Sequence, residues 1–177
     1  PGDCLYSPTM TAISQLQMSY SAEEDRILLR LNTTGDEEFR FWLTRRYAQL
    51  LVRALKAHRA ADPDVSTQVT PDAKKAVQEF KQEAAQEKGD FEKPFQPSEA
   101  FPLGSEPLLA FKLSYNVKGD KLALTIAPKE GQGINIVLDA NLNFNVTRLL
   151  RSASGSGKWL LDWGEDEPEI TSNRVVN

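Results

Sequence analysis

The sequence predicts an α+β fold in which one β-β-β-α unit occurs twice in tandem. First, residues 16–55 align without a gap on residues 111–150, so that Tyr20 falls on Tyr115. Second, the apolar positions of the two stretches coincide, first with the period of a strand and then with that of a helix. The units are therefore expected to form two antiparallel sheets, with their helices packed about a pseudo-twofold axis. The alternative is two unrelated meanders that each end in a helix.

The first unit is expected to contain three strands separated by two short turns. The first strand runs over about 13–20 and the second over about 26–32, and the third is centred on Phe41. Gly35, in the second turn, is able to take a positive φ. Alternation places six apolar side chains on the face toward the core. These residues are Ile27, Leu29, Leu31, Phe39, Phe41 and Leu43.

A helix is expected after the third strand of each unit. Thr44 is the expected N-cap of the first helix, and Asp139 occupies the matching position of the second unit. Tyr47, Leu51 and Leu55 lie on one apolar stripe of the first helix. A single unit has too little apolar surface to be stable alone, so the two units are expected to share a core.

The chain divides into five expected parts. They are an extension or cloning remnant (1–9), the first unit (10–61), a linker (62–107), the second unit (108–155) and an acidic tail (156–177). In the linker, Thr70-Pro71-Asp72 predicts the start of a helix that ends near Lys88. Val77, Phe80 and Ala84 would form its thin apolar stripe. The rest of the linker is expected to be extended, with Phe91, Phe95 and Phe101 packed onto the body.

Composition argues against several classes of site. Cys4 is the only cysteine and His58 the only histidine, which leaves out an intrachain disulfide and most zinc or haem sites. Asp25 and Asp120 are explained by turn chemistry, and no nucleophile with a base is evident. We therefore expect no catalytic site, no cofactor and no metal. Without a membrane-length apolar run or a signal peptide, a cytoplasmic protein is expected.

Charge points to a binding function. Both units are mildly basic, whereas the linker and the tail are acidic. Alternation places Arg26, Arg30, Arg40 and Trp42 on the solvent side of the first sheet, and Lys121 on that of the second. Arginine and tryptophan on a sheet can bind phosphates and stack on bases. Alternatively, this is an ordinary solvated face, with Trp42 covered by the phenylalanine-rich segment.

Aromatic residues outside the units suggest a second hypothesis. A protein-interaction adaptor would present Phe91, Phe95 and Phe101 of the linker, or Trp159 and Trp163 of the tail, to a partner. The tail could also fold back on the basic sheet and compete with a polyanion. In a third interpretation it is a final packed strand followed by a solvated end. A homo-oligomer is compatible with all of these interpretations.

The tandem units resemble the Whirly and Pur-alpha families of single-stranded nucleic-acid binders. The resemblance lies in repeated antiparallel units that each end in a helix. Arg26-Ile27-Leu28-Leu29-Arg30 and Glu38-Phe39-Arg40-Phe41-Trp42 are similar in kind to the strands of a Pur repeat. This chain departs from those families in having three expected strands per unit instead of four, and in its net charge of −4. The resemblance implies binding of single-stranded nucleic acid.

Overall fold

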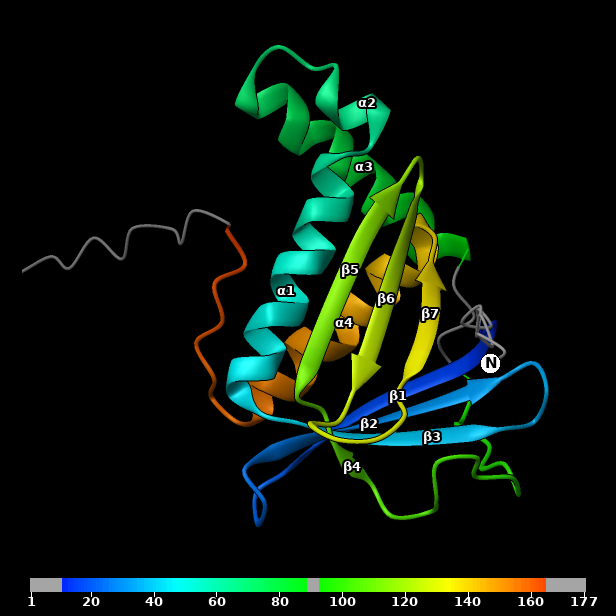
Figure 1. The fold of residues 1–177 in the computed structure, drawn as a ribbon. Coiled ribbons are helices and arrows are strands. Elements are labelled where there is room, and N and C mark those ends of the chain that lie inside the picture. Colours follow the sequence, from blue (N-terminus) through cyan, green and yellow to red (C-terminus); the bar gives the residue numbers. More distant parts are fainter. Residues whose placement is uncertain (1–10, 89–92, 165–177) are drawn as a thin grey trace, which may run out of the picture.

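The computed structural model describes residues 11–88 and 93–164 as a mixed α+β fold with two sheets and four helices (Figure 1). The strands are β1 (Ile13–Ser21), β2 (Arg26–Thr33), β3 (Glu38–Leu43), β4 (Leu108–Leu109), β5 (Lys112–Lys118), β6 (Lys121–Ala127) and β7 (Ile134–Leu138). The helices are α1 (Arg45–Ala60), α2 (Pro63–Ser66), α3 (Pro71–Lys88) and α4 (Ala140–Ser156). Within these residues, no helix has the length and apolarity that a membrane span requires.

The first sheet has the order β1-β2-β3-β4 and the second the order β5-β6-β7. The expectation of two purely antiparallel sheets is wrong for β4, which pairs in parallel with β3. The expected first strand of the second unit is split at Ala110. Its beginning, β4, pairs with the first sheet, and its continuation, β5, pairs with β6. The edge of β3 offers unpaired backbone groups, and the linker satisfies them as it passes.

Local predictions agree with the structure at the faces and caps. The six inward side chains of β2 and β3 are all at most 6% exposed, and their counterparts in β6 and β7 are also buried. The Thr44 hydroxyl accepts a hydrogen bond from the backbone N–H of Tyr47 at 3.2 Å. The Asp139 carboxylate accepts one from Leu142 at 2.8 Å. Alternation and capping are local effects, which is why the sequence predicts them well.

Two local features differ from the interpretation of the sequence. The positive φ of the second turn belongs to Asp36, at 59°, because the Thr33 hydroxyl accepts the N–H of Gly35 and shapes the turn before it. On α3, Phe80 is 71% exposed instead of lying in the inward stripe. Lys81 forms ion pairs with Asp62 (2.6 Å) and Asp64 (2.8 Å), and these orient α3 so that Phe80 points away.

One hydrophobic core includes residues of both units. Helix α1 packs on β5 of the second sheet, and α4 packs on β1 of the first sheet. The helices also contact each other, between the two sheets (Figure 1). Each helix therefore covers the sheet of the other unit.

Candidate nucleic-acid interface

The first candidate surface is the outward face of the first sheet, the side turned away from the core. Arg30 of β2 and Arg40 of β3 are cross-strand partners at its centre, so their side chains lie on the same face. The Glu38 carboxylate accepts a hydrogen bond from Arg30 Nε at 2.8 Å and from Arg40 Nε at 2.7 Å. The side chain of Glu38 is fully buried. The two predicted phosphate-binding arginines thus share an internal carboxylate.

Glu38 is held in its ionised form despite its burial. Burial alone would raise the pKa of this carboxyl group. Hydrogen bonds from Arg30, from Arg40 and from the backbone N–H of Ser98 more than offset burial, and they place the pKa below its usual value. The carboxylate consequently neutralises part of the positive charge on this face.

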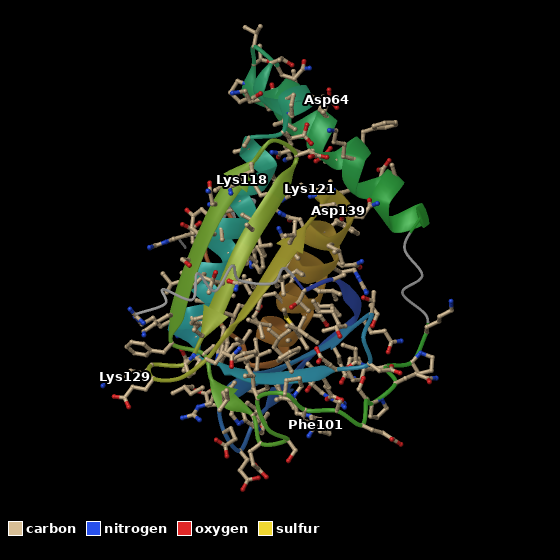
Figure 2. All side chains as sticks on the ribbon, turned by 45° about the vertical axis from the view of Figure 1, so that its right-hand side comes forward. Asp64, Phe101, Lys118, Lys121, Lys129 and Asp139 are labelled. Atoms are coloured by element: carbon tan, nitrogen blue, oxygen red, sulfur yellow. The ribbon has the colours of Figure 1, made fainter. Side chains whose placement is uncertain are left out.

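The segment 93–107, which we call the arm, runs across this face, in agreement with the alternative in which the phenylalanine-rich segment covers it. The Phe95 ring lies 4.2 Å from the guanidinium carbon of Arg30, and the Phe101 ring lies 4.7 Å from that of Arg40. Figure 2 shows Phe101 beneath the first sheet. Phe91 falls outside the described residues.

Hydrogen bonds also tie the arm to the face. The backbone N–H of Gln96 donates to Gln15 Oε1 at 2.9 Å, and the Gln96 carbonyl accepts from Asn32 Nδ2. Arg40 donates to the carbonyl of Ser105 at 3.1 Å. The arginines of the first sheet are therefore engaged by the chain itself.

The remaining predicted residues of the first surface lie at its margins. Trp42 is half-buried and is the register partner of Leu109 in β4. Arg26 lies at the start of β2 and forms an ion pair with Glu24 at 3.6 Å. Lys121 belongs to the second sheet, away from these residues. The structure brings together Arg30 and Arg40, with Trp42 next to Arg40 along the same face.

The outward face of the second sheet is the second candidate surface. Lys118 and Lys121 are register partners at one end of it, and both are exposed. Lys112 lies at the other end of β5, about 20 Å away at the usual rise per residue of a strand. Small and polar side chains lie between these lysines. They are Ser114, Asn116, Ala123, Thr125, Ala127, Asn135 and Val137.

Two features distinguish this second face. Strands β5, β6 and β7 contain no aspartate or glutamate. In Figure 1 no segment of 11–88 or 93–164 crosses it, and α1 and α4 lie behind the sheet. Sequence reasoning identified only Lys121 here. The alternation of Lys112-Leu113-Ser114-Tyr115-Asn116-Val117-Lys118 was the signal for the other two lysines.

The tryptophans of the tail are packed internally. Trp159 is buried, lies edge-on to Tyr20 with ring centres 5.8 Å apart, and donates from Nε1 to Asp25 at 3.2 Å. Trp163 lies 4.5 Å from the guanidinium carbon of Arg151. The described part of the tail thus contacts α1, α4 and, through Tyr20 and Asp25, the end of the first sheet; it packs its tryptophans without forming a strand, and competition with a polyanion stays a prediction. Residues 165–177 fall outside the described residues.

The hydrogen bonds to Asp25 affect its protonation. Tyr20 donates to its carboxylate at 2.7 Å, and this bond is the largest cause that lowers the pKa of Asp25. The Trp159 hydrogen bond lowers that pKa further. Asp25 is therefore a fixed anionic acceptor for the end of the second unit, in addition to being a turn residue.

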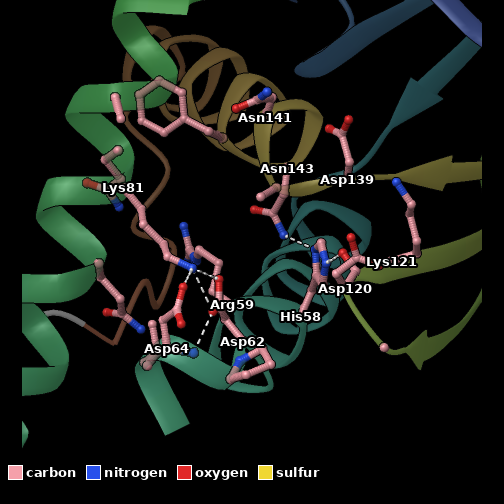
Figure 3. A pocket seen from close by; sticks show the side chains of 18 residues that line it. His58, Arg59, Asp62, Asp64, Lys81, Asp120, Lys121, Asp139, Asn141 and Asn143 are labelled. Atoms are coloured by element: carbon pink, nitrogen blue, oxygen red, sulfur yellow. Dashed lines mark hydrogen bonds and ion pairs between the residues drawn. The ribbon is translucent and has the colours of Figure 1, made fainter. Parts of the chain in front are cut away.

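A cavity of about 540 Å³ lies where α1, α2, α3 and the start of α4 meet (Figure 3). His58 is on its wall, with Nε2 donating to the Asp120 carbonyl at 2.8 Å and Nδ1 accepting from Asn143 at 2.8 Å. Because both ring nitrogens are engaged, His58 has no position left for a ligand. Among the residues that the structure describes, no group of three His, Cys, Asp or Glu side chains could hold a metal ion.

Comparisons with known proteins add no assignment to this geometry. No protein-family model, curated protein or solved structure matches the chain significantly.

Proposed function

We propose that this chain is a non-catalytic binder of single-stranded nucleic acid, and that the outward face of the second sheet is its open binding surface. The observation that carries the proposal is the set of Lys112, Lys118 and Lys121 on a sheet face without any carboxylate. The resemblance to Whirly and Pur-alpha proteins points to the same class of ligand.

The chemistry of this face suits a phosphate backbone. Lysine ammonium groups bind phosphates and release condensed counterions, which supplies affinity without sequence preference. The short side chains between them leave room for a strand to approach closely. Alternation places Tyr115 on the opposite side of the sheet from these lysines, together with Leu113 and Val117, so binding on the lysine face would depend on phosphate contacts and not on base stacking.

We also propose that the two units are copies of one ancestral unit related by a pseudo-twofold axis. The packing supports this because it is reciprocal: α1 of the first unit packs on β5 of the second, and α4 of the second unit packs on β1 of the first. The ends of the units show the same reciprocity. His58, near the end of α1, donates to the backbone carbonyl of Asp120 in the second unit. Trp159, after α4, donates to the carboxylate of Asp25 in the first unit. Asp25 and Asp120 correspond in the alignment.

The test is fluorescence anisotropy with a labelled 30-nucleotide single strand at increasing salt. Replacing Lys112, Lys118 and Lys121 by glutamine should weaken binding strongly at low salt. It should also reduce the slope of log affinity against log salt by about 2, since each phosphate contact in a single strand contributes about 0.7.

The matched control removes the same charge elsewhere. Arg46, Lys74 and Lys75 are exposed on α1 and α3 and lie outside the strands of the second sheet, and their replacement by glutamine should leave the slope unchanged. An equal loss of affinity in both variants would show that binding depends on the net charge of the protein and not on the second-sheet face. A wild-type protein that ignores the strand at micromolar concentration and low salt would refute the proposal.

A protein-interaction adaptor is the second candidate. Its anchors Phe95, Phe101 and Trp159 are engaged inside the molecule, but Leu160 is 82% exposed beside Trp159. Leu160 is therefore the side chain of the described tail through which a partner protein could make contact. Absence of nucleic-acid binding would leave this function as the better one.

A further inference from the structure

We propose that the outward face of the first sheet is a second single-strand site, which the arm occupies as an intramolecular competitor. This inference rests on the proposed function, because it extends the same ligand class to the other sheet. The first sheet is the counterpart of the second in the alignment of the two units. Its outward face is therefore the position equivalent to the open lysine face.

The arm engages this face with interactions that a nucleic acid would also use. A flat ring lies on each guanidinium, at 4.2 Å for Phe95 on Arg30 and at 4.7 Å for Phe101 on Arg40. Bases of a single strand stack on arginine planes and on aromatic rings in the same manner. Carbonyl oxygens of the arm accept hydrogen bonds from Asn32 and Arg40, as sugar and phosphate oxygens would. A base and a phenylalanine of the arm therefore cannot occupy one arginine together.

The arm lies on the surface of the body, and of its residues only Leu103 packs against the hydrophobic core, as a partly buried side chain. Most of its residues are exposed, and Phe95 and Phe101 are only half-buried. Its backbone is hydrogen-bonded to the edge of the sheet at Ala100, whose carbonyl accepts a hydrogen bond from the backbone N–H of Glu38 at 2.8 Å. Only after the arm does the chain enter the sheet, as β4. Displacement of the arm would thus leave the buried strands and helices intact.

The uncovered face would present two arginines and a tryptophan. Glu38 would offset one of the two positive charges of Arg30 and Arg40, and Trp42 would add a stacking surface. The arm carries Glu99 and Glu106, which favour its retention on a cationic surface. Binding to this face would therefore be weaker at first than binding to the second sheet, and it would require the arm to leave.

The first test releases the arm in a protein that lacks the open site. In the variant with Lys112, Lys118 and Lys121 changed to glutamine, Phe95→Ser with Phe101→Ser should restore affinity for the 30-mer by about tenfold or more. A synthetic peptide of residues 93–107, added to this variant with a released arm, should compete with the DNA for binding. The same peptide with both Phe replaced by Ser should not compete. Unrestored binding by a variant that still melts cooperatively would overturn the inference.

A second measurement uses the wild-type protein and so does not depend on the folding of a variant. The backbone amides of Gln96 and Ser98 donate to Gln15 and Glu38, and they should exchange with solvent faster when the 30-mer is saturating. Unchanged or slower exchange would contradict arm displacement.

The outcomes separate this inference from the proposed function. If the lysine changes leave wild-type binding unaffected while arm release increases it, the second-sheet surface is wrong and the first-sheet site stands. If neither the wild type nor the variant with a released arm binds DNA, and that variant binds only the arm peptide, both nucleic-acid proposals are overturned.

Discussion

The outward faces of the two sheets differ in how their positive charges are used. On the first sheet, two arginines share the buried Glu38 and carry the phenylalanine rings of the arm. On the second sheet, the cations are lysines that remain exposed. A guanidinium is flat and weakly hydrated, so it stacks and pairs inside a protein, whereas an ammonium keeps its water. The comparison teaches that the type of cation decides which face the chain can cover with its own segments.

Removal of Glu38 would test the comparison most severely. Glu38→Gln leaves Arg30 and Arg40 facing each other without their shared charge, and should destabilise the protein by about 2 kcal/mol, less than the roughly 3–5 kcal/mol for a fully buried pair because both arginines are partly exposed. Urea unfolding followed by circular dichroism measures the change. Glu99→Gln, the same substitution at an exposed position of the arm, should have almost no effect. Equal stability of the two variants would mean that Glu38 does not organise the first face.

Acidification should affect the first face and not the second. The pKa of Glu38 is lowered in the folded protein, so its stabilising contribution is present above its unfolded pKa of about 4.3. That contribution should be lost as the pH falls through the lower folded pKa. The stability difference between wild type and Glu38→Gln should therefore shrink below about pH 4, and unfolding curves from pH 7 to pH 3 would show it. A constant difference over this range would contradict the pKa shift.

The smallest expected effect concerns a single ring of the arm. Phe101→Leu keeps an apolar side chain but loses the stacking on Arg40, which is worth about 0.5–1 kcal/mol at a partly exposed site. Phe111→Leu, beside the second sheet, provides a comparison ring that stacks on no cation among the residues that the structure describes. Differential scanning calorimetry should find the larger decrease in melting temperature for Phe101→Leu. Equal decreases would show that only apolar burial matters.

Periodicity predicted the strands, the inward faces and both N-caps, because these features depend on neighbouring residues. The same alternation that placed Arg40 and Trp42 outward also places Glu38 there, so the ion pair of Glu38 with Arg40 could have been anticipated from β3 alone. Cover of this face by the phenylalanine-rich segment was one of two alternatives, but the contact of Phe95 with Arg30 could not be predicted, since these residues are far apart in the chain and nothing local links them. The separation of β4 from β5 could not be predicted for the same reason, because the pairing of strands depends on partners that are distant in the sequence.

Because each helix packs on the other unit's sheet, the sheet and helix that lie next to each other along the chain are not the pair that packs most extensively. A backbone break within the connection from α3 to β4 would yield two fragments, one with its sheet open to α4 and the other with its sheet open to α1. Neither fragment could bury its apolar surface alone, yet each carries the helix that the other lacks. The molecule is thus suited to fragment complementation, in which mixing two unfolded pieces regenerates a single folded protein.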